Sequence, residues 1–308
     1  MAKTEKASFQ VRSLDMNGMG GRMVVLPATA DTTSEIFFVY DRCSSLEQWS
    51  ALLEYLRRFG TVTAPDLPGF GGMASFYTIN VRPNINNYAD YLAAFFKLRF
   101  RRKQVVIVGV GFGMVVVTRM LQRYPHLAKH VRQVVSIGGY TSCGDLRPAR
   151  RRYWVQRVMY RTGSLWIPAF IVCRLYFNRF MLPRLIARSP GAVRITDSEE
   201  RLAYITAEIT TWRNNDFRTR MFVNSELLTF DNCGKRLTLP LWHVVPGGQD
   251  AHTQHEIEQR LRVIFEEVTC FETTVTEQQL GELTTSTASK LIPPRLRQLL
   301  RKSLHNAS

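Results

Sequence analysis

An apolar run that leads into a glycine-rich turn restricts the fold of this chain more than any other feature. Residues 105–110 are mostly valine and isoleucine, which favours a buried β-strand. Gly109, Gly111 and Gly113 alternate with other residues, and residues 114–121 continue with the apolar spacing of a helix. Glycines at such a turn allow a strand and a helix to approach closely. The segment therefore predicts a strand–turn–helix unit, which is typical of α/β proteins with a parallel sheet.

The same turn has the spacing Gly-x-nucleophile-x-Gly, in which the flanking glycines let strand and helix pack around one exposed residue. Gly109 and Gly113 are the flanks, and the nucleophile position is Gly111. Glycine has no side chain and cannot attack a substrate. It does relieve the strained backbone of such a turn, which costs a residue with a Cβ atom about 1–3 kcal/mol.

Segments on both sides of this turn resemble, in chain order, motifs of the α/β-hydrolase superfamily. A short apolar strand and the helix after it come first, then a strand that runs into a Pro-Asp-Leu-Pro-Gly-Phe-Gly loop, and after the turn a strand that ends near a candidate acid. These segments are residues 35–40, 46–56, 60–71 and 239–250. The resemblance spans roughly residues 8 to 290 and identifies the chain as a suspected, catalytically degenerate member of the superfamily.

The resemblance implies an α/β fold with a mostly parallel central sheet flanked by helices. Residues 1–144 and 235–308 would form this core, and residues 145–234 would form an arginine-rich helical cap inserted into it. The stretch 164–170 also resembles, faintly, part of the cap of maspardin, a non-catalytic branch of the superfamily. A tight strand-to-helix turn in another α/β fold is the alternative.

An active member needs a nucleophile, a base, an acid and donors for an oxyanion. The resemblance puts Gly111 at the nucleophile position and Asp250 at the acid position. The loop that should carry the base offers Gly281-Glu282, and no histidine lies between His255 and His305. The degenerate triad positions are therefore Gly111, Asp250 and Glu282.

The family's His-Gly pair after the third strand, which helps to form the oxyanion hole, aligns with Tyr40-Asp41. A carboxylate is thus expected where an oxyanion would develop. We expect a binding cleft formed by Tyr40, Asp41, Gly111, Phe112 and Cys143.

Loss of a triad nucleophile or base typically lowers turnover about a million-fold, which corresponds to about 8 kcal/mol of barrier. We therefore predict a non-catalytic binding or scaffolding module, whose enlarged pocket could take an acyl-like, hydrophobic ligand. The alternative is an active esterase- or lipase-like hydrolase with atypical catalytic residues. Cys143, at the end of the predicted strand 133–137, is the thiol that could serve such an enzyme.

The net charge is +16, and part of it is concentrated in the predicted cap. Eleven arginines and no acidic residue lie between Arg147 and Arg194, interleaved with aromatic and aliphatic residues. One interpretation is a cap whose apolar face packs on the core while the arginines stay solvated. The other is a surface for an anionic membrane or an acidic protein. Nucleic acid is disfavoured because no known nucleic-acid module accompanies the charge.

Cofactor and metal sites are not expected. A dinucleotide fingerprint would need its third glycine at Met114, and no acidic residue follows about 20 positions on. His252 and His255 alone are too few ligands for a closed zinc site.

The five cysteines include no Cys-x-x-Cys pair, and their odd number favours a reducing compartment. No signal segment is evident at the start, and no run reaches the roughly 18–20 apolar residues that span a bilayer. We expect a cytoplasmic protein, with peripheral membrane association if the cap binds lipid.

Overall fold

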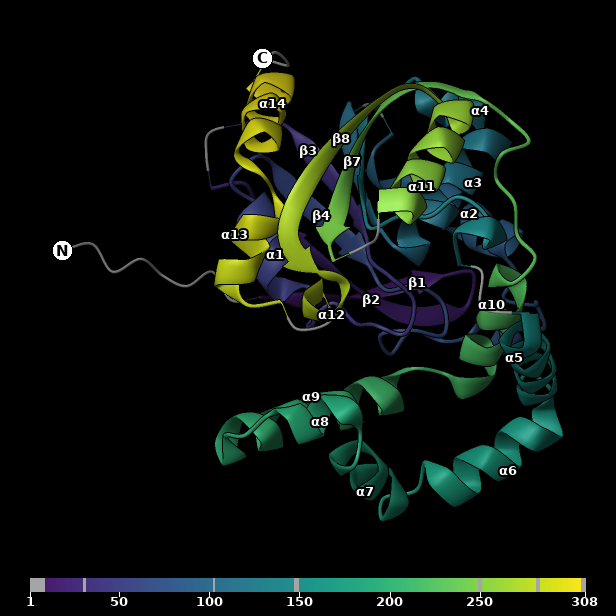
Figure 1. Cartoon of the computed structure of the whole chain (residues 1–308). Helices are drawn as coiled ribbons and strands as arrows, with labels where there is room; N and C mark the ends of the chain where they lie inside the picture. The colour runs from purple at the N-terminus through teal and green to yellow at the C-terminus, as the bar shows by residue number, and fades with distance from the viewer. Residues whose placement is uncertain are drawn as a thin grey trace.

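The central element is an eight-stranded sheet with the strand order β1-β2-β4-β3-β5-β6-β7-β8 (Figure 1). The computed structural model describes residues 9–29, 32–101, 103–146, 150–248, 251–280 and 283–305. The strands are β1 (Val11–Met16), β2 (Met19–Leu26), β3 (Glu35–Val39), β4 (Thr61–Pro65), β5 (Val105–Val110), β6 (Val131–Ile137), β7 (Leu237–Gly247) and β8 (Phe265–Thr276).

The sheet is antiparallel at one edge and parallel elsewhere. β1 pairs antiparallel with β2, and β2 pairs antiparallel with β4. β3 runs parallel to β4 and to β5, and β5 to β8 continue in parallel. All carboxyl ends of the parallel strands therefore meet at one edge. The mostly parallel α/β-hydrolase fold predicted from the sequence is confirmed.

Both faces of the sheet are covered, which explains why β5 is apolar at every position. Val105 and Ile107 belong to one buried cluster, whereas Val106, Val108 and Val110 belong to the other. A strand whose side chains point alternately into two buried clusters therefore has a continuous apolar sequence.

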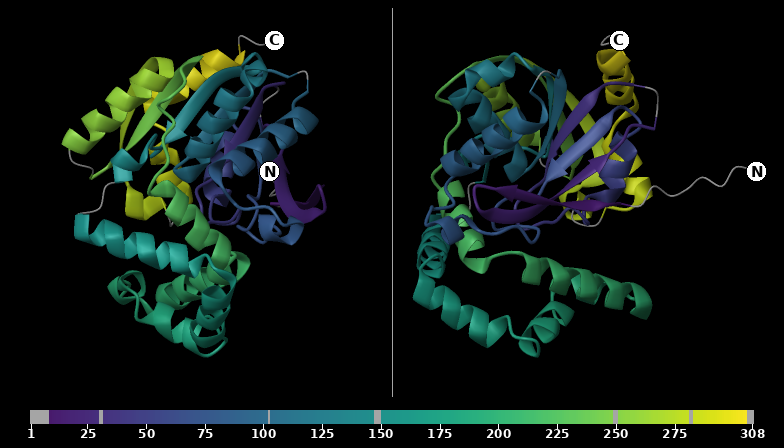
Figure 2. Two further views of the ribbon diagram at one scale, coloured as in Figure 1. Left: turned by 90° about the vertical axis from the view of Figure 1, so that its right-hand side faces the viewer. Right: turned by 180° about the vertical axis from the view of Figure 1, so that it is seen from behind.

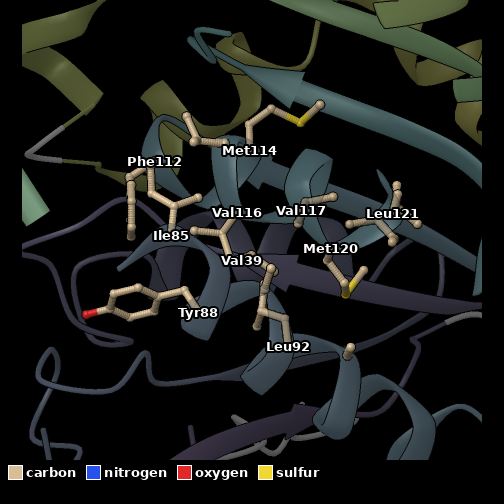
Figure 3. Close-up of a cluster of buried hydrophobic side chains, with 14 of the residues drawn as sticks. Val39, Ile85, Tyr88, Leu92, Phe112, Met114, Val116, Val117, Met120 and Leu121 are labelled. Carbon is tan, nitrogen blue, oxygen red and sulfur yellow. The ribbon is translucent and has the colours of Figure 1, made fainter. Parts of the chain in front are cut away.

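Three longer helices on one face are α2 (Ile85–Arg99), α3 (Phe112–Arg123) and α11 (Ala251–Ile264). Figure 3 shows the buried side chains with which α2 and α3 meet, among them Leu92 and Val116. The opposite face is packed by α1 (Ser50–Leu56), α13 (Thr285–Leu291) and α14 (Pro294–His305). The short helices η1 (Phe76–Ile79), α4 (Pro125–Ala128) and α12 (Glu277–Leu280) lie in connections.

The cap comprises the helices inserted between β6 and β7. It contains η2 (Cys143–Leu146), α5 (Arg150–Gly163), α6 (Trp166–Tyr176), α7 (Met181–Ala187), α8 (Pro190–Arg194), α9 (Ser198–Asn214) and α10 (Phe217–Leu227). Figures 1 and 2 show α6 to α9 projecting from the core, on the side away from α14. Side-chain caps set two helix starts, since Asp197 accepts from Glu199 N and Glu200 N, and Asp216 accepts from Thr219 N.

One predicted boundary is wrong. The apolar pattern predicts a helix from residue 46, but α1 begins at Ser50. Trp49 N and Ser50 N donate to carbonyls three residues back, at Leu46 and Glu47. The Trp49 indole N–H also donates to Ser44 Oγ at 2.7 Å. This local bond favours turns over the first turn of a longer helix.

In the part of the chain that the structure describes, no helix combines the length and the apolar character needed to cross a bilayer.

Gly113 shows how closely α3 approaches the sheet, and it provides a test of the fold. A Cβ atom there would lie 2.6 Å from Tyr40 O and still closer to Val39 O, both of which are backbone atoms. We expect Gly113→Ala to lower the free energy of unfolding by about 1–3 kcal/mol or more. Gly20→Ala is the matched control, because a Cβ atom at Gly20 meets nothing within 4 Å. Urea unfolding of both variants measures the difference, and equal stabilities would contradict the close approach.

Candidate functional site

The turn between β5 and α3 is centred on Gly111. Its backbone has φ 49° and ψ −117°, a conformation that favours glycine. Gly111 N donates to Ile137 O at 3.1 Å, which ties the turn to the end of β6. The sharp strand-to-helix turn predicted from the glycine spacing is therefore present, with a bare α-carbon at its tip.

A carboxylate lies directly over this tip. Asp41 follows β3, and its Oδ1 accepts a hydrogen bond from Phe112 N at 2.7 Å. A Cβ atom on Gly111 would lie 2.6 Å from the same Oδ1. Phe112 is the first residue of α3, so its N–H has no acceptor within the helix. The negative charge of Asp41 is favourable at the helix N-terminus.

Arg42 holds the Asp41 loop in place. One guanidinium nitrogen lies 3.6 Å from Asp41 Oδ1 and donates to the Tyr140 hydroxyl at 2.9 Å. The Nε atom donates to Asn224 Oδ1 at 2.9 Å. Burial lowers the pKa of Arg42, but the oxygens of Tyr140 and Asp41 raise it above its usual range. The charged guanidinium therefore links the loop after β3 to the end of β6 and to α10.

A cleft of about 450 Å³ opens at this edge of the sheet. Its larger apolar lining residues are Trp49, Val110, Ile137 and Leu280. The remaining lining residues are Asp41, Arg42, Cys43, Ser44, Gln48, Gly111, Gly138, Tyr140 and Glu208. The cleft lies at the carboxyl ends of β5 and β6, where ligands bind in open α/β sheets.

The fold and the turn agree with what a comparison of the sequence with protein families shows. The model of the Alpha/beta hydrolase family matches residues 24–274, which include the sheet from β3 to most of β8 and the whole cap. The chain belongs to the alpha/beta hydrolase family.

The curated relatives are distant. Protein ABHD8 of Homo sapiens and Protein ABHD8 of Bos taurus are each 32% identical to the chain over 110 residues. The match covers 34% of this chain and 23% of either relative, so the chain spans about a quarter of their length.

Solved structures show the same fold. A thermophilic esterase from Thermogutta terrifontis superposes with a TM-score of 0.61 and 15% identity, covering 96% of this chain and 99% of that one. MenH from S. aureus superposes with a TM-score of 0.62 and 10% identity, covering 91% and 98% of the two chains. Identities this low establish a shared fold and no shared activity.

The predicted site residues fall into three groups. Asp41 and Gly111 both line the cleft of this alpha/beta hydrolase. The described residues that line the cleft do not include Tyr40, Phe112 or Cys143. Asp250 and Glu282, assigned to the acid and base positions, lie outside the described residues.

The reasons differ for the three side chains that leave the cleft. The Tyr40 hydroxyl turns into the core and donates to Asp66 Oδ1 at 2.5 Å. The Phe112 ring packs edge-on against Tyr88 at 5.3 Å, so this residue offers only its backbone N–H (Figure 3). Cys143 packs half-buried against the α2–α3 cluster.

Sequence reasoning did not identify Arg42, Trp49, Gly138 or Tyr140 as cleft residues. One signal for Gly138 and Tyr140 was available, because they follow the apolar run of β6 at the same edge as the glycine turn. Arg42 and Trp49 carry no comparable motif.

Cys43 is a thiol that does line the cleft. Its backbone has φ 58°, which is unusual for a residue other than glycine. Burial raises the pKa of the Cys43 thiol, against the lowering effect of Arg220 and Arg42. A thiol that stays protonated is a poor nucleophile.

Asp66 is buried and directly follows β4, at the start of the loop of residues 66–71. It accepts hydrogen bonds from Tyr40 and from Arg22 Nε, the latter at 2.8 Å. Burial raises the pKa of Asp66 to about 7, although these two partners lower it. The network braces the loop that follows β4.

A serine–histidine contact exists, but it lies inside the sheet. His243 Nδ1 is 3.1 Å from Ser136 Oγ, between neighbouring strands β7 and β6. Both residues are buried, so no substrate reaches the hydroxyl. The pair is part of the core of the sheet.

The burial of His243 leads to a prediction of how the stability of the protein depends on pH. Burial lowers the pKa of His243 from 6.5 to about 4. The unfolded chain then binds a proton near pH 6.5 and the folded chain only near pH 4. The contribution of His243 is therefore complete above pH 6.5 and is lost as the pH falls toward 4, by about 3 kcal/mol.

Urea unfolding of the wild type and His243→Gln between pH 7.5 and 4 measures this dependence. We expect the difference in unfolding free energy between them to shrink as the pH falls. Asp66 has the opposite dependence, because its folded pKa is raised, and it cancels in that comparison. His252→Gln, at an exposed histidine, is the control. A difference that does not change with pH contradicts the prediction.

Proposed function

We propose that the protein is a non-catalytic alpha/beta hydrolase that acts as a binding or scaffolding module. The observation that carries this proposal is the Asp41 carboxylate, hydrogen-bonded to Phe112 N directly above the bare α-carbon of Gly111. At this turn there is thus no side chain to act as the nucleophile, and the N–H that would stabilise an oxyanion is already hydrogen-bonded to Asp41.

The oxyanion argument is electrostatic. In the family, the N–H of the residue after the nucleophile helps to stabilise the developing negative oxygen. Here that N–H is Phe112 N, and a negative oxygen already accepts from it. A second anion at this point would be repelled by Asp41. Removal of one such donor typically lowers turnover about 10²–10³-fold.

The missing base adds to this. The chain has no histidine between His255 and His305, the interval that contains the family's base loop. Replacing the nucleophile alone therefore cannot restore proton transfer from it. A nucleophile and its base act as a unit in catalysis. Restoring one of them without the other is therefore not expected to restore activity.

The cleft retains the means to bind. Its apolar lining residues Trp49, Val110, Ile137 and Leu280 suit an acyl-like chain, and Asp41 disfavours a ligand that ends in a carboxylate. We therefore propose a neutral, acyl-like ligand or a partner segment of that character.

A cytoplasmic site of action fits the cysteines. All five thiols are free and at least partly covered, as in a protein of a reducing compartment.

An active hydrolase is the competing function, because the family is mostly hydrolytic. It would need an attacking group other than Gly111. Among the described lining residues of the cleft, Cys43 is the one with a thiol. The raised pKa of Cys43 argues against it.

Activity-based labelling separates the two functions. We expect no reaction of the folded protein with a fluorophosphonate probe, because no serine stands at the turn. Gly111→Ser should also remain unlabelled and inert toward p-nitrophenyl esters, since Asp41 displaces its side chain and no base is present.

Gly111→Ser combined with Asp41→Gly removes the clash and is expected to stay inert for lack of a base. An active serine hydrolase treated in parallel is the positive control. Labelling of the wild type, or burst acylation of either serine variant, would contradict the proposal.

Ligand binding is tested separately with a neutral fluorescent alkyl amide. We expect the amide to bind the wild type and to bind at least about tenfold more weakly to Leu280→Trp, which narrows the cleft. Leu98→Trp, at an exposed site on α2, is the matched control and should bind normally. Equal binding by all three proteins would place the amide outside the cleft.

A further inference from the structure

The helices α5 and α6 expose large apolar side chains that a globular core would normally cover. We call this set the apolar cap face. The relative solvent-accessible surface areas of Trp166, Ile167 and Phe170 are 65%, 62% and 59%. The other members are Trp154, Val155, Val158, Met159, Leu165, Ile171 and Leu175, all exposed.

The spacing shows that this face is a property of the helices rather than a few stray residues. On α6, residues 166, 167, 170, 171 and 175 recur at intervals of three and four, so they share one side. The opposite side is apolar too, with buried Ala169 and half-buried Val172. Arg174 is the one charged residue of this helix. A helix that is apolar all round is normally covered by protein or lipid.

Basic charge accompanies the apolar cap face along the same segment of the chain. Residues 150–194 contain ten arginines and no aspartate or glutamate. Among these arginines the side chains of Arg151, Arg152, Arg161, Arg174 and Arg179 are exposed. Such a surface, apolar with a basic surround, is typical of interfacial helices.

A second basic feature adjoins this face. A cleft of about 610 Å³ between α5, α10 and η1 is lined by Arg82, Arg157, Arg161 and Arg218, with Glu226 as the acidic residue of its described lining. The Arg218 guanidinium lies 3.7 Å from the centre of the Tyr77 ring and donates to Ser164 O at 2.9 Å. Leu165, a member of the apolar cap face, also lines this cleft.

We propose that the apolar cap face docks on the surface of an anionic phospholipid bilayer. Trp166, Ile167 and Phe170 enter the boundary between headgroups and acyl chains, while the surrounding arginines and the arginine-lined cleft contact lipid phosphates. The inference goes beyond the proposed function and does not depend on it.

Charge favours lipid over a second copy of this chain. Two copies in contact through α5 and α6 would bring arginines against arginines, because residues 150–194 supply no acidic partner. A nucleic acid would supply phosphates but no apolar layer for Ile167 and Phe170. An anionic bilayer supplies both an apolar layer and a negative surface.

The arrangement of the cap also permits this contact. α6 lies on the projecting arm of the cap, away from α13 and α14 (Figures 1 and 2). A flat surface can therefore approach α6 without meeting those C-terminal helices.

Flotation of the full chain with vesicles tests the proposal. The vesicles contain phosphatidylcholine alone or phosphatidylcholine with about 30% phosphatidylserine, in 50 mM or 500 mM salt. We expect binding to the anionic vesicles at low salt, weaker binding at high salt and little binding to phosphatidylcholine alone. Tryptophan emission should shift to shorter wavelength on binding as Trp166 leaves water.

Two pairs of variants separate the apolar and the charge contributions. Ile167→Asp with Phe170→Asp should lower the partition coefficient at least about tenfold, whereas Leu98→Asp, on α2, should leave it unchanged. Arg152→Glu with Arg161→Glu should lower it similarly. Arg101→Glu with Lys129→Glu makes the same charge change at the opposite edge of the sheet and should have a smaller effect.

Three outcomes overturn the proposal: no flotation with anionic vesicles at low salt, equal loss in the cap variants and their controls, or a dimer that Phe170→Asp dissociates in a protein that does not bind vesicles. Circular dichroism of each variant establishes that it is folded. Fluorophosphonate labelling does not report on this surface, so failure here is distinguishable from failure of the proposed function.

Discussion

The hydrogen bond from Phe112 N to the Asp41 carboxylate is the contact on which the chemistry of this fold depends. In a working member of the family the same N–H meets an oxyanion only while a substrate reacts. Here the Asp41 carboxylate of the protein itself takes that place. The N–H at the start of α3 is thereby hydrogen-bonded in the resting state, and this contact is the basis of our proposal that the protein is non-catalytic.

Several residues maintain this arrangement at a distance from the contact itself. Arg42 is bound to Tyr140 and Asn224, so the loop that carries Asp41 is tied to β6 and α10. Gly113 lets α3 approach the backbone of β3 closely enough for Phe112 N to reach Asp41. The position of Asp41 over the turn therefore depends on contacts that also connect β3, β6, α3 and α10.

The cap differs from the core in how far its apolar side chains are covered. In the core, both faces of the sheet are covered, and the buried apolar residues of the strands belong to one of two clusters. In the cap, α6 is apolar on its covered and on its open side, and the neighbouring segments of the chain carry exposed arginines. The carboxylate over the turn belongs to the core, whereas the uncovered apolar face belongs to α5 and α6 of the cap.

The sequence by itself determined the elements whose signal is local. The apolar run of β5, the glycine turn and the helical spacing of α3 are each readable within about 20 residues, because backbone conformation and side-chain periodicity are short-range properties. The absence of a side chain at Gly111 and the carboxylate of Asp41 were readable in the same way, through their places in a family motif.

Only the tertiary structure decided which side chains meet. Arg42 and Asn224 are 182 residues apart in the chain, and no local pattern pairs them. Tyr40 illustrates the same limit, because its neighbour Asp41 faces the cleft while its own hydroxyl turns inward to Asp66. Adjacent residues at a strand end point to opposite sides, so the fold, through the alternation of the sheet and the loops that pack on it, assigns one to the site and the other to the core.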